Sequence, residues 1–272
     1  MTNSSRTSRI GAHWVMITLS ALAIFPVYWM VQTSFRAPNE IFSTRLWPAS
    51  PTLQNYRDVM AAMPIFGILW NTFVMAAATT LAQVATGLLA AWALVRWRFP
   101  GGRLAHSLIA LSWLVPFQVV MIPNYVLATR LGLMDSVTGL VLPNAAAAFA
   151  VLVLYNAMRG FPREVLEAAR LDGAGSLRTL TEVVLPNLRA PIASISILCF
   201  ISAWNEYFWP LLLIRKIDNS VVQIGLQFFL TQEGNDWGLL MAAATLASLP
   251  ILLIYLVLQR QVVDSFMKSG IR

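Results

Sequence analysis

The sequence predicts an all-α, polytopic membrane protein with six membrane-spanning helices. Hydrophobic residues make up 58% of the 272-residue chain and charged residues only 11%, whereas a soluble domain holds roughly 25% charged residues. Six stretches are apolar over the roughly 20 residues that a helix needs to cross a bilayer. The segments between these stretches are short, so none of them is expected to form a soluble domain.

Runs that lack Asp, Glu, Lys and Arg set the limits of the predicted spans. The first run follows Arg6 and Arg9, as a secretory signal would. It exceeds the usual 7–15 apolar residues and no Ala-x-Ala cleavage pattern follows, so we expect a retained anchor. Only the fifth span contains a charged residue, Glu206. The predicted spans are 13–34, 69–95, 104–124, 137–158, 190–214 and 237–259.

The distribution of basic residues predicts that both termini lie in the cytoplasm. With the first residue inside, thirteen of the 19 Lys and Arg fall in inner segments and six in outer segments. The net charge of +7 does not indicate a nucleic-acid partner, because the arginines are scattered and form no patch along the sequence. The expected parts are a cytoplasmic tail at 1–12, a six-helix domain at 13–260 with an inner loop at 159–189, and a cytoplasmic tail at 261–272.

The inner loop is expected to contain two short helices. Pro162 suits the first position of a helix, Glu164 suits its first turn, and Gly173 suits the left-handed residue that ends it. These signals predict a helix over about 162–172. A second helix is predicted from Ser176, as its N-cap, to a break at Pro186.

This loop resembles the cytoplasmic signature of permease subunits in binding-protein-dependent ABC importers. The likeness rests on Glu167-Ala168-Ala169, Gly173 and Leu185-Pro186 at their spacing, with Val183 where isoleucine is common. The chain is similar to the carbohydrate-uptake subclass, and within it to the smaller permease of the maltose type. That similarity rests on Leu53–Tyr56, Val115-Pro116, Met121–Pro123, Trp204–Tyr207 and an inner tail at Phe266–Arg272 that lacks the usual extra residues.

The resemblance implies an ABC importer permease fold in the bacterial inner membrane. It implies four kinds of partner: a homologous second permease, a dimer of ATP-binding-cassette ATPases, a periplasmic solute-binding protein and membrane lipid. The inner loop would be the coupling helix that docks on the ATPase, through Glu167, Ala168, Ala169, Asp172, Gly173, Leu185 and Pro186. The outer loop would contact the binding protein, through Asn219, Gln223, Gln227, Asn235 and Asp236, unless it is a solvated connector.

Polar residues inside the spans suggest a substrate pathway. An ionisable group within a span is costly and is by default a functional hypothesis. Glu206, with Asn205, could bind sugar hydroxyls; alternatively, Glu206 pairs with helix-end donors or a neighbouring subunit. Prolines in spans leave backbone carbonyls without helical partners, and either a pathway or ordinary kinks would explain them. The prolines are Pro116, Pro123, Pro143 and Pro250, with Gln118, Asn124 and Asn144 nearby.

The sequence predicts no catalytic or metal-binding set. Neither Lys216 nor Lys268 follows a glycine, so the chain has no phosphate-binding P-loop. We therefore expect ATP and Mg²⁺ to be bound by the partner ATPase. Cys199 is expected to be a small packing residue. A permease for a polyol or for a sugar or glycerol phosphate, an ion-coupled secondary transporter and a membrane enzyme remain as alternatives.

Overall fold

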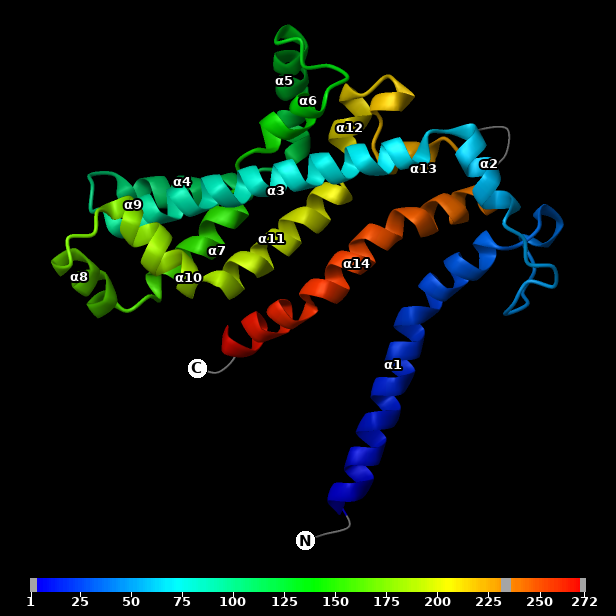
Figure 1. Cartoon of the computed structure of the whole chain (residues 1–272), viewed down its shortest axis with the longest axis horizontal. Coiled ribbons are helices and arrows are strands. Elements are labelled where there is room, and N and C mark those ends of the chain that lie inside the picture. Colours follow the sequence, from blue (N-terminus) through cyan, green and yellow to red (C-terminus); the bar gives the residue numbers. More distant parts are fainter. Residues whose placement is uncertain (1–3, 231–235, 270–272) are drawn as a thin grey trace. The chain divides into compact units, whose positions relative to one another are not determined.

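The computed structural model describes residues 4–230 and 236–269, and no β-strand element occurs among them (Figure 1). The chain divides into two units. The first comprises 1–65 and 225–250, and the second comprises 66–224 and 251–272. The all-α fold predicted from the sequence is confirmed.

The first unit contains the N-terminal helix and the segment that follows it. Its elements are α1 (Ser4–Ser34), η1 (Pro38–Glu40), α2 (Gln54–Ala62) and the first part of α14 (Trp237–Ser269).

The second unit contains most of the remaining helices. Its elements are α3 (Ile65–Arg96), α4 (Gly102–Ser112), α5 (Phe117–Arg130), α6 (Val137–Val141), η2 (Leu142–Asn144), α7 (Ala148–Arg159), α8 (Arg163–Leu171), α9 (Ser176–Arg178), the π-helical segment η3 (Thr179–Val184), α10 (Leu185–Asn187), α11 (Arg189–Trp204), α12 (Phe208–Leu213), η4 (Ile217–Asn219), α13 (Val222–Gln227) and the last part of α14.

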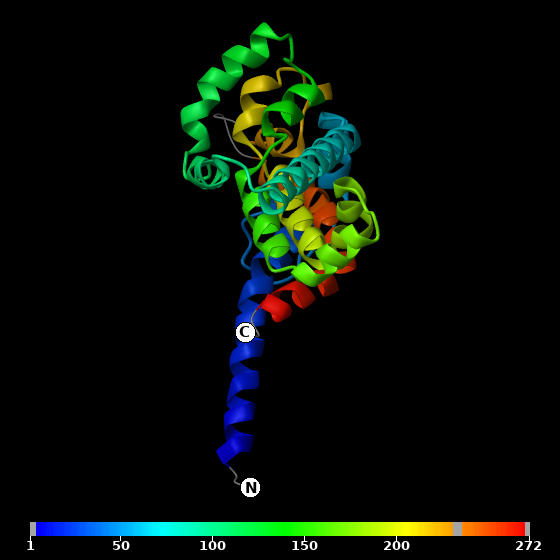
Figure 2. The same ribbon diagram turned by 90° about the vertical axis from the view of Figure 1, so that its left-hand side faces the viewer.

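Among the described residues, three unbroken helices are long and apolar enough to cross a membrane. They are 11–34 of α1, all of α3, and 237–257 of α14. Three bent helix pairs raise the number to six if each pair forms one span. The bends measure 96° between α4 and α5, 49° between α6–η2 and α7, and 83° between α9–α10 and α11. Figure 2 shows the bend that separates α4 from α5.

The predicted spans at 104–124, 137–158 and 190–214 each contain a break or a bend rather than one continuous helix. Pro116 has extended backbone angles (φ −61°, ψ 136°) and directly precedes α5. A residue that precedes proline is disfavoured in the α conformation, and the chain leaves the helix just before Pro116. Pro143 lies in the short 3-10 segment η2, and α11 ends at Trp204 before a new helix starts at Phe208. By contrast, Pro123 and Pro250 lie within continuous helices.

A buried arginine orders the segment that follows α1 in the first unit. The Arg36 side chain is fully buried and donates to Gln32 Oε1 at 2.9 Å and to backbone carbonyl oxygens of Glu40, Ser43 and Arg45. Buried charge is costly unless it is fully hydrogen-bonded, and these acceptors provide that bonding. The hydrogen bonds of Arg36 therefore hold the backbone of 36–45 in a loop around its side chain.

The Leu53–Tyr56 motif has a structural role in the same unit. Asn55 Nδ2 donates to the carbonyl oxygens of Ser34 at 2.9 Å and Arg36 at 2.8 Å, which caps the end of α1. A Cβ on Gly238 would lie 2.7 Å from Asn55 Oδ1, so only glycine allows α14 to approach this asparagine so closely. The motif thus joins α1, α2 and the start of α14.

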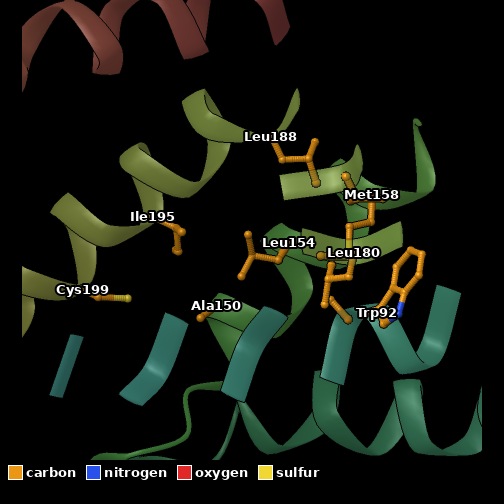
Figure 3. Packing of buried hydrophobic residues seen from close by; sticks show 10 residues of the cluster. Trp92, Ala150, Leu154, Met158, Leu180, Leu188, Ile195 and Cys199 are labelled. Carbon is orange, nitrogen blue, oxygen red and sulfur yellow. The ribbon is translucent and has the colours of Figure 1, made fainter. Parts of the chain in front are cut away.

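The second unit is organised around an apolar core. It contains Trp92 of α3, Leu154 and Met158 of α7, Leu180 of η3 and Ile195 of α11 (Figure 3). Cys199 is a buried free thiol in the same cluster, which confirms its prediction as a packing residue. This core connects the inner loop to the spans, so a displacement of the loop is opposed by the packing of α3, α7 and α11.

Candidate functional site

The helix α8 forms the first half of the inner loop, and its end has a defined geometry. Gly173 has φ +76°, as predicted. Its N–H donates to the Arg170 carbonyl at 3.0 Å, and the N–H of Ala174 donates to the Ala169 carbonyl at 2.9 Å. These two bonds form a Schellman motif, which satisfies the last carbonyls of the helix. The predicted helix is confirmed as α8 (Arg163–Leu171), but Pro162 is its N-cap residue rather than its first helical residue as predicted.

Each side of α8 has a different environment. Ala169 is 8% exposed and Leu166 packs against the Trp92 core. Glu167 and Ala168, on the other hand, are exposed. Leu171 is 89% exposed, an exposure that an apolar side chain in water would not favour without a partner. Leu171 was not among the coupling residues predicted from the sequence, although it directly follows Arg170 at the end of the predicted helix.

The second half of the inner loop is one helical run that does not break at Pro186. It passes from α9 through the π-helical η3 into α10 and ends at Leu188. The prediction of a break at Pro186 is wrong, because the π-helical turn ends just before it. Pro186 falls in the first turn of α10, where its lack of an N–H costs little. Leu185 packs against the core, whereas Pro186 is exposed.

The prediction that Ser176 caps this helix is also wrong. Gly175 occupies the N-cap position and makes no side-chain cap. The Ser176 Oγ instead accepts a hydrogen bond of 3.0 Å from Trp92 Nε1. This bond links the start of the run to Trp92 of the apolar core.

A small polar pocket lies within the spans of the second unit, at the break between α11 and α12. Its volume is about 100 Å³. Two of the predicted pathway residues, Asn144 and Glu206, line it. The other polar lining residues were missed by the sequence analysis: Thr79, Gln83 and Ser202. These three side chains are uncharged. The spans were located by their lack of charged residues, so nothing distinguished these residues from the rest of their spans.

The other predicted pathway residues lie outside this pocket. Gln118 is exposed and Asn124 is half-buried on α5. Asn205 is exposed beside Glu206 and accepts a hydrogen bond from Gln223 at 3.2 Å. The structure therefore brings together Asn144 and Glu206 but not the other three.

Most donors around the pocket already have backbone partners. Gln83 Nε2 donates to the Asn144 carbonyl at 2.8 Å, and Asn144 Nδ2 donates to the Leu140 carbonyl at 3.1 Å. These carbonyls lie beside the Pro143 break, where non-helical backbone at membrane depth needs such partners. The amide groups therefore stabilise the break, and their oxygens remain as acceptors.

Glu206 has a helix-end donor as its partner. Its Oε1 accepts from the backbone N–H of Trp209 at 3.3 Å, in the first turn of α12. No side chain among the described residues donates to this carboxylate. A carboxylate at a helix N-terminus is favoured by the helix dipole. Glu206 therefore has the helix-end donor that one of its two predicted roles requires. Its second carboxylate oxygen can accept a hydrogen bond from another donor.

The outer loop is partly fastened to the second unit. Asp135 has φ +51°, and its carboxylate accepts the backbone N–H groups of Arg215 at 2.6 Å and Lys216 at 3.0 Å. These two backbone hydrogen bonds hold the pKa of Asp135 below its usual value. Asn219 donates to the Asp135 carbonyl at 2.9 Å. The loop is therefore anchored here rather than a free connector.

Five outer-loop residues were predicted to contact a binding protein. Asn219 and Gln223 use their side-chain amides in hydrogen bonds to Asp135 and Asn205. Gln227 and Asp236 are exposed, and Asn235 lies outside the described residues. Among the described residues, no group of three or more His, Cys, Asp or Glu could hold a metal ion.

Comparison with known proteins places the chain in a family. Residues 83–268 match the family described as "Binding-protein-dependent transport system inner membrane component". The chain belongs to this family. The permease is 31% identical to the sn-glycerol-3-phosphate transport system permease protein UgpE of Escherichia coli O1:K1, over 96% of both chains. It is 32% identical to UgpE of Pectobacterium atrosepticum, over 99% of both chains.

Solved structures show the same fold. The permease superposes with a TM-score of 0.83 on a chain of a bacterial ABC transporter involved in the import of the acidic polysaccharide alginate, covering 96% of this chain and 98% of that one at 24% identity. It superposes with a TM-score of 0.59 on a chain of the MetNI methionine ABC transporter, covering 76% and 97% at 18% identity. The permease is an inner-membrane component with the ABC importer permease fold.

Proposed function

We propose that this permease forms, with a homologous second permease, the path by which an ATP-driven importer takes up a neutral, hydroxyl-rich solute. The solute class is a sugar or a polyol. The observation that carries this proposal is the acceptor-rich pocket around Glu206, in a chain whose family transports solutes delivered by binding proteins.

The chemistry of the pocket favours a solute that donates hydrogen bonds. The Gln83 and Asn144 amide nitrogens are already bonded to backbone carbonyls, so their oxygens remain available as acceptors. Glu206 adds a carboxylate oxygen, and no lining residue carries a positive charge. Sugar and polyol hydroxyls donate to such groups, whereas a phosphate group would be repelled by the carboxylate.

The relatives support a second candidate. UgpE belongs by its name to a glycerol 3-phosphate transport system, and its 31–32% identity covers nearly the whole chain. A sugar phosphate or glycerol phosphate is therefore the competing substrate class. Neutral sugars or polyols and phosphate esters differ in net charge, so the experiment asks whether the pocket accepts a negatively charged solute.

Coupling to ATP hydrolysis is assigned to the inner loop. In this proposal α8 docks on a partner ATPase, which binds ATP and Mg²⁺ and hydrolyses the nucleotide. The exposed Glu167, Ala168 and Leu171 would face the ATPase, and Ala169 would hold α8 against the spans. Asp172 and Gly173 end the helix, and Leu185 and Pro186 position the following run. Both termini lie in the cytoplasm in this arrangement, and a periplasmic binding protein contacts the outer loop.

Transport by the assembled system tests the substrate class. The permease pair, the ATPase and the cognate binding protein are reconstituted, and ATPase stimulation is measured with glycerol, monosaccharides, disaccharides and glycerol 3-phosphate. We expect stimulation by at least one neutral solute and none by glycerol 3-phosphate. Stimulation by the phosphate ester alone would refute the assignment of a neutral solute.

Two variants test the pocket itself. Glu206→Gln keeps an acceptor for the Trp209 N–H but removes the charge, and we expect uptake to fall at an unchanged amount of protein in the membrane. Asn205→Ala is the matched control, because Asn205 is the neighbouring residue and lies outside the pocket. Equal effects of the two variants on uptake would contradict a role for the pocket.

A further inference from the structure

A second pocket lies between the inner end of α3 and the helix α8. Its volume is about 470 Å³. Four arginines line it together with one carboxylate, that of Glu167. Figure 1 shows α8 at the end of α3 where the chain leaves that helix. The arginines are Arg96, Arg98, Arg163 and Arg170.

Two of these arginines come from one stripe of α8. Arg163, Leu166, Glu167 and Arg170 recur at the spacing of one helix face, and all four line the pocket. Ala168 and Leu171 lie outside this stripe. Glu167 therefore belongs to both surfaces of α8, whereas Ala168 and Leu171 lie only on the surface that is available to the ATPase.

The arginines have no partner within the part of the chain that the structure describes. None of their side chains donates a hydrogen bond there, and the ion pair present in that part joins Arg178 and Glu182. Three are exposed and Arg96 is half-buried. Four guanidinium groups beside one carboxylate leave the pocket with a net positive charge that attracts an anion from outside the chain.

The position of the pocket indicates which anion. Arg96 is the last residue of the span α3, and Trp97, half exposed, follows it directly and also lines the pocket. Tryptophan at the end of a span marks the interface between lipid and water. Basic pockets between helices on the cytoplasmic side take the head groups of anionic lipids.

We propose that this pocket binds the phosphate of an anionic phospholipid of the inner leaflet and so holds α8 against the end of α3. The guanidinium groups provide paired N–H donors that match phosphate oxygens. This inference goes beyond the proposed transport function but rests on its orientation, with the 159–189 loop in the cytoplasm. The lipid would be a structural ligand that stabilises the position of the loop.

The test measures lipid binding to the assembled transporter in detergent. A fluorescent short-chain phosphatidylglycerol is titrated, with phosphatidylcholine as the zwitterionic comparison and inorganic phosphate as competitor. We expect phosphatidylglycerol to bind at least tenfold more tightly than phosphatidylcholine. Arg98→Gln and Arg163→Gln should each weaken its binding about fivefold, because each removes one positive charge near the anionic head group.

Arg178→Gln is the matched control, because it removes one arginine from the same loop outside the pocket, and it should change binding less than twofold. Equal binding of the two lipids, or no difference between the pocket variants and the control, would overturn the proposal. Displacement of the lipid by inorganic phosphate at equal concentration would show a site for free phosphate instead. If the Arg98→Gln variant no longer bound the ATPase but bound the lipid as before, the arginines would instead form a contact with the ATPase. None of these binding results depends on transport by the unmodified protein, so a failure of the lipid proposal leaves the proposed transport function untouched.

Discussion

The left-handed residue at the end of α8 allows the coupling role to be tested without disturbing the spans. Gly173 has φ +76°, and a Cβ placed there would meet no heavy atom within 4 Å. The substitution Gly173→Val therefore introduces backbone strain but no clash. A residue with a Cβ in this conformation costs roughly 1–2 kcal/mol, and relaxation of that strain would break the two bonds of the Schellman motif.

That strain sets the size of the expected effect. If α8 must keep its end geometry to dock, 1–2 kcal/mol corresponds to a factor of about 5–30 in the population of the docking-competent form. We expect Gly173→Val to weaken binding of the ATPase by this factor and to lower uptake. The assay is titration of the ATPase onto the variant permease in detergent, together with uptake in cells.

Gly175→Val provides the matched control. Gly175 lies two residues away, a Cβ there also meets no atom within 4 Å, and its backbone angles (φ −65°, ψ 166°) suit valine. We expect this variant to bind the ATPase within twofold of the unmodified chain. Normal ATPase affinity and uptake for Gly173→Val would refute the coupling role of α8. Loss of that variant from the membrane, with Gly175→Val retained, would refute the premise that the strain stays within the loop.

Three further predictions concern orientation, packing and pH. A reporter fused at residue 225 should report the periplasm; a cytoplasmic signal there would contradict the six-span orientation. Gly139→Ala should lower thermal stability by about 1–3 kcal/mol, because its Cβ would lie 2.1 Å from the Leu133 carbonyl oxygen, whereas Gly160→Ala, with no atom nearer than 3.7 Å, should have little effect. Asp135→Ala should lower the melting temperature at pH 7. Since folding lowers the pKa of Asp135, its stabilising effect is present above about pH 4 and is lost as the pH falls through the lowered value. The melting temperatures of variant and unmodified chain should therefore converge in acid, and a constant difference at all pH values would contradict this.

The long spans could be predicted from the sequence because apolar length is sufficient to define them. The runs behind α1, α3 and α14 contain no charge over the width of a bilayer, and each forms one helix. The length of the apolar run does not predict the structure at 104–124, because it carries no information about a change in the direction of the helix axis. Pro116 was the local sign of a break there, but it does not specify the 96° angle between α4 and α5.

Contacts distant in sequence explain what the sequence analysis missed. Arg36 was counted as an outer charge, but it is fully buried and bonded to backbone carbonyls, which every residue type carries. Gln83 donates to the Asn144 carbonyl from another helix, so no local pattern marks it. Gly173, by contrast, was predicted correctly, because the conformation that ends a helix is a local property that glycine favours.

Reconstitution in proteoliposomes tests the central claim most directly. Vesicles contain this permease, its homologous partner and the ATPase, with the binding protein and a labelled neutral solute outside. We predict uptake only when ATP and Mg²⁺ are enclosed and the binding protein is present, and no ATP hydrolysis by this chain alone. Uptake by this chain without the ATPase, driven by an imposed ion gradient, would contradict the account and support a secondary transporter.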